Sequence, residues 1–248
     1  MKQPFLYTII AALALLLFPG SEALAQGDAP RFEIGGQFSL LSRNKPSSQD
    51  DDFVSGQVTD PGFGARFTYN VTNEIAFEAE GNFFPGRDFN SEGGFFTRPD
   101  NDLGVPSGHI YQGQFGVKAG KRFKKIGLFG KVRPGFVRFT QVSQFTGFRI
   151  VPLFHPSQGR EVQVENAEFR LGKATYFSMD LGGVVEFYPS RRIVTRLDIG
   201  DTIIRYGIYR EALGAVCPLS SPCPTQVFER PAETRHNLQF SAGIGIRF

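Results

Sequence analysis

The sequence contains many short segments, each about ten residues long, in which apolar and polar side chains alternate. The stretch FGARFTYNV at residues 63–71 is typical. Its odd-numbered positions hold Phe, Ala, Phe, Tyr and Val, and its even-numbered positions hold Gly, Arg, Thr and Asn. Successive side chains point to opposite faces of a β-strand, so this pattern predicts a strand with one apolar and one polar face.

Eight such segments follow one another along the chain, and their charged residues fall almost entirely on the polar faces. They span residues 32–40, 63–71, 75–83, 111–119, 126–133, 177–187, 193–200 and 238–248. No other predicted element could cover eight apolar faces. A membrane barrel resolves this by turning the apolar faces to lipid and the polar faces to the lumen. We therefore expect an all-β, eight-stranded antiparallel transmembrane β-barrel.

The connections between these segments alternate strictly between short and long. The short ones lie at residues 72–74, 121–125 and 188–192, and the long ones at 44–60, 85–108, 141–172 and 208–234. The long connections are rich in Pro, Gly, Ser, Asn and Asp, as surface loops are. Outer-membrane barrels have short periplasmic turns, long extracellular loops and periplasmic termini. The spacing predicts the same arrangement here.

The N-terminal residues predict export. Lys2 is followed by an apolar run at residues 5–18, a Pro-Gly break and the small-residue motif Ala23-Leu24-Ala25. This is the pattern of a cleaved signal peptide. The run is too short for a membrane-spanning helix, which needs about 20 residues. We expect a signal peptide at residues 1–25 and a single barrel domain at residues 26–248.

Composition and motifs argue against several function classes. A formal charge of +3 is too small to indicate nucleic-acid binding, and 29 Gly with 27 Phe suits a β-protein with tight turns. Glycine-rich phosphate loops, paired zinc motifs and nucleophile elbows are absent from the sequence, so we expect no cofactor and no metal. Cys217 and Cys223 are expected to form a disulfide in the oxidising periplasm, since two thiols without a nearby His make a poor zinc site.

The last segment, FSAGIGIRF, ends the chain on an aromatic residue. It resembles the C-terminal sorting signal that the barrel-assembly machinery of bacteria recognises, with Phe240, Ile244, Ile246 and Phe248 on one face. An alternating strand with a free edge can pair with the edge of a receptor. Together with residues 177–192 and 196–201, this segment makes the chain similar to the OmpA-like family of small outer-membrane barrels. The resemblance implies the fold and an outer-membrane location, but no activity.

The polar faces place twelve charged residues in the expected lumen, with acids and bases in balance. They are Glu33, Arg66, Glu78, Glu80, Lys118, Lys131, Arg133, Asp180, Glu186, Arg196, Asp198 and Arg247. The interior of an eight-stranded barrel is just wide enough for side chains to fill it. Opposite charges in so narrow a space should pair, so we expect an ion-pair network that plugs the lumen rather than a charge-lined pore.

Three functions remain open at this point. The favoured one is a structural or surface-interaction barrel that lies among outer-membrane lipid and lipopolysaccharide and binds an unknown extracellular ligand through four long loops. The second is a lipid A-modifying enzyme that uses a rim histidine, and the candidates are His109, His155 and His236. No Ser follows His109 or His236 by two positions, so we expect no catalytic residue. The third is a minor narrow channel.

Overall fold

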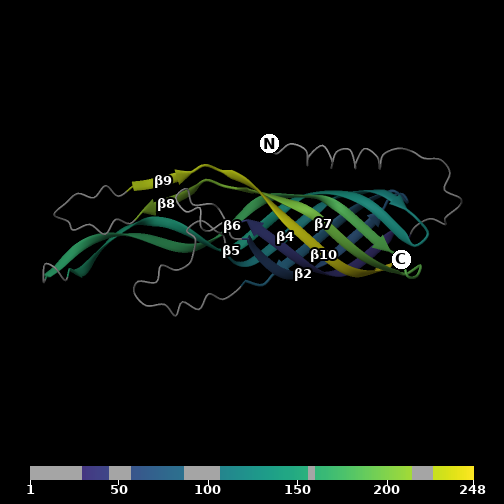
Figure 1. The fold of residues 1–248 in the computed structure, drawn as a ribbon, viewed down its shortest axis with the longest axis horizontal. Coiled ribbons are helices and arrows are strands. Elements are labelled where there is room, and N and C mark those ends of the chain that lie inside the picture. The colour runs from purple at the N-terminus through teal and green to yellow at the C-terminus, as the bar shows by residue number, and fades with distance from the viewer. Residues whose placement is uncertain (1–29, 45–56, 87–106, 156–159, 214–225) are drawn as a thin grey trace.

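The structure, a computed structural model, describes residues 30–44, 57–86, 107–155, 160–213 and 226–248. Its strands are β1 (Phe32–Asn44), β2 (Gln57–Asn70), β3 (Ile75–Phe84), β4 (Ser107–Arg122), β5 (Ile126–His155), β6 (Arg160–Phe187), β7 (Ile193–Tyr206), β8 (Tyr209–Leu213), β9 (Gln226–Arg230) and β10 (Glu233–Arg247). Eight of them close into an antiparallel barrel in the order β1-β10-β7-β6-β5-β4-β3-β2 (Figure 1). The predicted fold class is confirmed.

The described residues contain no helix that is long and apolar enough to cross a membrane.

The three short connections lie where the sequence predicts them, and hydroxyl groups hold two of them. Thr72 Oγ1 accepts hydrogen bonds from the backbone N–H groups of Glu74 and Ile75 at 3.1 and 3.0 Å. Ser190 Oγ accepts from Arg192 and Ile193 at 3.3 and 3.1 Å. Such side-chain bonds replace backbone bonds in tight turns. These turns set the register of β2 with β3 and of β6 with β7.

The first and last strands close the barrel at the same end as these turns. Phe32 and Phe248 exchange two backbone hydrogen bonds of 3.0 and 2.9 Å, and their rings stack with centroids 5.9 Å apart. We call this end, with the three short connections, the turn end, and the opposite end the loop end. Closure leaves the barrel wall without a free strand edge.

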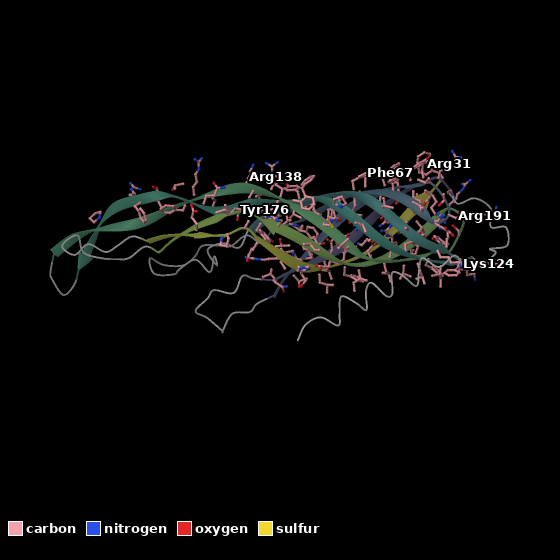
Figure 2. The ribbon with its side chains drawn as sticks, turned by 90° about the horizontal axis from the view of Figure 1, so that it is seen from above. Arg31, Phe67, Lys124, Arg138, Tyr176 and Arg191 are labelled. Atoms are coloured by element: carbon pink, nitrogen blue, oxygen red, sulfur yellow. The ribbon has the colours of Figure 1, made fainter. Side chains whose placement is uncertain are left out.

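The outer wall is apolar, as the alternation predicts. Phe63, Phe115 and Ile244 expose about 60% of their surface. Similar residues cover every barrel strand, and Figure 2 shows side chains projecting outward around the barrel. Soluble proteins rarely expose so large an apolar surface. Facing lipid, the same surface is the stable arrangement.

The prediction of a long loop at residues 141–172 is wrong. β5 and β6 continue through it as a paired hairpin up to the His155–Arg160 pair. Register shifts occur at Phe139/Val142 and Phe145/Gly147, and each extra residue moves the following side chains to the opposite face. The bulges therefore interrupt the alternation on which the prediction depended. Part of the fourth loop also forms strands, because β8 pairs with β9.

The first and second predicted loops shorten at their edges, because β1 reaches Asn44, β2 begins at Gln57 and β4 at Ser107. Their centres, residues 45–56 and 87–106, lie outside the described residues, as do the predicted signal peptide and the proposed Cys217–Cys223 disulfide.

The position of Phe248 generates a prediction about assembly. Replacing it with Asp would place a charge on the lipid-facing terminal strand and remove the stacking on Phe32. We expect Phe248→Asp to accumulate in the periplasm, whereas Phe248→Tyr should insert normally. Cell fractionation after expression measures both. Normal insertion of the Asp variant would contradict a sorting role for this residue.

Candidate functional site: the barrel interior

All twelve predicted lumen charges point into the barrel and are buried. Glu78, Lys118, Arg133, Asp180 and Glu186 expose none of their surface. The structure adds further interior charges, among them Arg122 near the turn end and Arg43 near the loop end. Sequence analysis missed them because the predicted fourth segment stopped at residue 119 and the first at residue 40.

Arg196 is the centre of the network. Its guanidinium donates to Glu78 Oε2 at 2.9 Å and forms a second bond to Glu78 Oε1. It also donates from Nε to Asp198 Oδ2 at 2.6 Å and from Nη2 to Asp198 Oδ1 at 2.7 Å. Two carboxylates thus hold one guanidinium by paired bonds, the strongest geometry available to arginine. The bonds to Glu78 cross from β7 to β3 through the lumen.

A second arginine spans part of the lumen, from β5 to β3. Arg133 on β5 donates from Nε to Asp180 Oδ2 at 3.0 Å, and its Nη1 bonds Glu80 on β3. Lys131, two residues away, lies 2.9 Å from Asp180 and 3.2 Å from Asp198. Asp180 therefore neutralises two cations, and Lys131 links the Arg133 group to the Arg196 group.

Lys118 on β4 connects the centre of the network to the turn end. Its ammonium bonds Glu186 and lies 3.4 Å from Glu78 Oε1. It also sits 4.6 Å from the centroid of the Phe129 ring. Thr68 donates to Glu78 Oε1 at 3.3 Å. Glu78 therefore contacts groups from β2, β4, β5 and β7.

Tyr188, just past the end of β6, organises the turn end. Its O–H donates to Glu186 Oε2 at 2.7 Å, and its oxygen accepts from Arg122 Nε at 2.8 Å. Burial raises the pKa of the Tyr188 phenol, and the neighbouring Glu186 carboxylate raises it further. Arg247 donates to Glu33 Oε1 at 3.1 Å and lies 4.6 Å from the Tyr188 ring centroid.

Glycines on the inner face allow neighbouring backbones to approach closely beside these long side chains. A Cβ on Gly116 would lie 2.0 Å from the Val132 carbonyl oxygen, and one on Gly182 would lie 2.1 Å from the Ile199 carbonyl oxygen. Gly116 pairs with Glu78, and Gly182 pairs with Lys131. Small residues beside large charged ones thus let the interior fill without clashes.

A layer of uncharged polar side chains lies between the charged network and the loop end of the barrel. Gln112 and Gln239 exchange hydrogen bonds of 2.9 and 3.2 Å, and Thr202 donates to Gln239 Oε1 at 2.7 Å. Asn82 donates to Gln112 at 2.9 Å and accepts from Gln37 at 2.9 Å. This layer crosses the lumen from β1 to β7.

The loop end of the lumen is apolar, which sequence analysis did not predict. The cluster consists of Leu41, Phe84, Ile110, Val137, Phe139, Val142, Ile204 and Tyr206, with Ala174 and Tyr176 against it. Most of these residues lie beyond the predicted segments. The sequence signal that could have revealed the cluster is the continuing two-residue period, which puts Val137 and Phe139 on the inner face of β5 and Ile204 and Tyr206 on the inner face of β7. Arg43, paired with Asp60 at 2.6 Å, lies over the Phe139 ring.

The two histidines with described side chains lie at the rim of the loop end. His236 Nδ1 is 2.5 Å from Asp201 Oδ2, and His109 Nδ1 accepts from the Gly86 N–H at 2.9 Å. Among the described residues neither ring hydrogen-bonds a hydroxyl group, which a serine-type nucleophile would require. The described residues also contain no metal-ligand cluster. The His155 side chain lies outside the described set.

Phe240, Ile244, Ile246 and Phe248, the residues of the expected sorting signal, all face outward on or just past β10 and are exposed. They therefore belong to the lipid-facing wall and not to the interior site.

The apolar outer wall and the filled polar interior define a small integral membrane β-barrel. The family model described as the outer membrane protein beta-barrel domain matches residues 10–248, and the chain belongs to this family. Its place is therefore the bacterial outer membrane. Comparison with curated protein sequences gave no match.

Several solved structures are similar. Neisserial surface protein A has 10% identity and a TM-score of 0.44, covering 90% of this chain and 100% of that one. Ail, the attachment invasion locus protein of Yersinia pestis, has 12% identity and a TM-score of 0.42, covering 88% and 99%. The N-terminal barrel of Pseudomonas aeruginosa OprF has 10% identity and a TM-score of 0.38, covering 90% and 100%.

The network predicts a large loss of stability when one partner is removed. Arg133→Ala would leave Glu80 and Asp180 without their shared partner, and breaking a buried pair in this way costs about 3–5 kcal/mol. The exposed turn residue Lys124, labelled in Figure 2, is the control, because exposed ion pairs contribute only about 0–1 kcal/mol. Urea unfolding of the barrel in lipid vesicles measures both. Equal unfolding midpoints for the two variants would contradict the network.

Proposed function

We propose that this protein is a non-enzymatic outer-membrane anchor, with a closed lumen, that binds an extracellular partner through β-ribbons at its loop end. The observation that carries the proposal is the contrast between the two halves of the molecule. Charge pairs and an apolar cluster fill the barrel, whereas β5 and β6 continue far beyond it.

The first ribbon is built by β5 and β6 alone. The β4–β5 pairing reaches Gln141 and the β6–β7 pairing reaches Phe177, whereas β5 and β6 stay paired up to His155 and Arg160. Thirteen residues from Val142 to Phe154 extend about 43 Å at about 3.3 Å per residue. Figure 1 shows this ribbon projecting from the barrel.

The second ribbon continues the adjacent part of the wall, formed by β7 and β10. β8 begins three residues after β7 ends, and β9 ends three residues before β10 begins. β8 and β9 pair with each other, and β8 also contacts β5. The two ribbons therefore lie on the same end of the molecule (Figure 1).

Two-stranded ribbons have free edges, and free edges suit recognition. Their unpaired N–H and C=O groups can bond an added strand, while alternate side chains provide specificity. Exposed charges such as Arg149, Glu168 and Arg170 discourage indiscriminate edge pairing. The centroids of the Phe145 and Phe148 rings lie 5.0 Å apart beside the second bulge, and the two rings form an aromatic pair on the ribbon.

The orientation and route to the membrane belong to the same proposal. Residues 1–25 act as a cleaved signal peptide, the assembly machinery receives β10, and the turn end faces the periplasm. The outer wall then contacts membrane lipid and the loop end contacts lipopolysaccharide. The alternation of short and long connections in the sequence supports this orientation.

The filled interior predicts that the wild-type barrel carries no steady ionic current. Planar-bilayer recordings of purified protein measure this, and Arg133→Ala should show occasional openings because an ion pair that crosses the lumen is lost. A steady wild-type conductance whose ion selectivity changes in lumen variants would instead identify a channel.

Removing one ribbon tests the binding role. Val142 pairs with Gly172, so residues 143–171 can be replaced by an Asn-Gly turn, which suits a tight hairpin. Whole cells carrying the wild type or this variant are then screened against an array of purified extracellular proteins and glycans. We expect ligands that bind the wild type to be lost. A second variant shortens the β8–β9 hairpin instead, and comparing the two variants shows which ribbon contributes most of the contact.

Heat-dependent gel mobility checks that each shortened barrel is folded. Ligand binding that survives removal of both ribbons would contradict the proposal, since the remaining wall would then suffice.

A further inference from the structure

The lipid-facing wall contains a groove that crosses four strands. Its volume is about 590 Å³, and it lies over β2, β3, β4 and β5. Its floor is a row of small residues paired across neighbouring strands, Ala65 with Gly81 and Gly81 with Gly113. The missing side chains leave a hollow in the apolar wall.

Rows of larger residues border this floor on both sides. Toward the turn end, Ile34 pairs with Phe67, Phe67 with Ala79 and Ala79 with Phe115. Phe67 and Phe115 expose 43% and 60% of their surface, so they stand out from the wall. They form the lower side of the groove.

A ladder of aromatic rings that ends in a cation lies one row beyond the floor, toward the loop end. Phe63 pairs with Phe83, Phe83 with Tyr111 and Tyr111 with Arg138. The centroids of Phe63 and Phe83 lie 5.5 Å apart and those of Phe83 and Tyr111 lie 5.1 Å apart. Figure 2 shows Phe67 and Arg138 on the same side of the molecule, with Arg138 nearer the loop end.

The groove runs obliquely across the wall. Its end on β5, beside Arg138, lies nearer the loop end than its end on β2. Ala65 lies five residues from Asn70, the turn-end residue of β2, whereas Phe136, which pairs with Gly113, lies ten residues from Ile126, the turn-end residue of β5. The floor covers two interstrand steps of about 4.8 Å, and a third step to Phe136 makes the groove about 14 Å long. An oblique apolar channel of this size fits one acyl chain.

Arg138 marks the head-group end. It is exposed, and it makes no ion pair with another described residue. Lys173 and Arg205 are also exposed on the outer wall of β6 and β7 at the loop end. Arginine binds phosphate through two parallel hydrogen bonds, and a neighbouring lysine adds charge. A cation directly above an apolar groove complements a phosphorylated lipid.

We propose that this groove, with Arg138 at its upper end, binds one lipid A molecule of the outer leaflet, holding an acyl chain over Gly81 and a sugar phosphate at Arg138. The choice of outer leaflet rests on the proposed orientation of the barrel. The groove faces lipid whichever way the protein inserts.

Gly81 offers a direct way to fill the groove. A Cβ added there meets no atom within 4 Å, so a larger side chain would enter the groove without clashing inside the protein. Gly81→Leu is the groove-filling variant, and Ala119→Leu, on the exposed outer face of β4 outside the groove, is its control. Arg138→Gln removes the cation, and Arg191→Gln, at an exposed turn, is the matched control.

The experiment titrates the full barrel in neutral detergent with lipid A, with phosphatidylglycerol and with inorganic phosphate, and counts bound lipid by native mass spectrometry. We expect lipid A to bind with one-to-one stoichiometry. Gly81→Leu should weaken binding about tenfold through lost apolar contact. Arg138→Gln should weaken it about tenfold through a lost charged hydrogen bond. Both controls should bind as the wild type does.

Several outcomes would overturn the proposal. Unchanged binding by Gly81→Leu would exclude the groove, and unchanged binding by Arg138→Gln would exclude phosphate recognition. Equal affinity for phosphatidylglycerol would overturn the assignment to lipid A. A dimer that Gly81→Leu dissolves would identify a second copy as the occupant.

The detergent titration does not depend on orientation. Protease added to intact cells tests orientation separately, because it should cut the β5–β6 ribbon only if the loop end is outside. Failure of that test with intact lipid A binding would reject the proposed orientation, and with it the outer-leaflet assignment, but not lipid binding in the groove.

Discussion

Lipid offers no hydrogen-bond partner, so every backbone N–H and C=O group in the spanning strands has to be paired within the protein. The barrel meets this constraint by pairing β1 with β10, which joins the first and last strands in one continuous ladder. The alternation of side chains then follows from the strand geometry. One face meets lipid, and the other is enclosed by eight strands.

Enclosure makes charge pairing obligatory. A single charge in a narrow, poorly hydrated interior is costly, and removing one member of a buried pair is strongly destabilising. The network meets this requirement because several of its residues contact more than one partner of opposite charge. Arg196 and Arg133 each hydrogen-bond two carboxylates, and Glu78 contacts groups from four strands. A pair such as Arg196 and Glu78 also fixes the distance between opposite walls, so the same contacts fill the lumen and set its shape.

The composition of the outer surface differs between the barrel and the ribbons beyond it. Around the barrel, aromatic and aliphatic side chains meet lipid, and the Ala65–Gly81–Gly113 floor is a local exception in which small residues create space. Beyond the barrel, β5 and β6 need no lipid-facing surface, and their composition changes accordingly. The apolar cluster around Phe139 lies between these two regions and separates the charged lumen from the ribbons.

The sequence by itself determined the eight barrel strands, the inward or outward direction of the side chains within the predicted segments and the identity of twelve interior charges, because a two-residue period is local and can be followed along the chain. It did not determine the partners. Arg196 and Glu78 are 118 positions apart, and their contact depends on the stagger of strands around the closed barrel. The ribbon and the apolar cluster also emerged only in the tertiary structure. Two bulges near Phe139 and Phe145 shift the alternation, and where paired strands leave the barrel depends on pairing between distant residues.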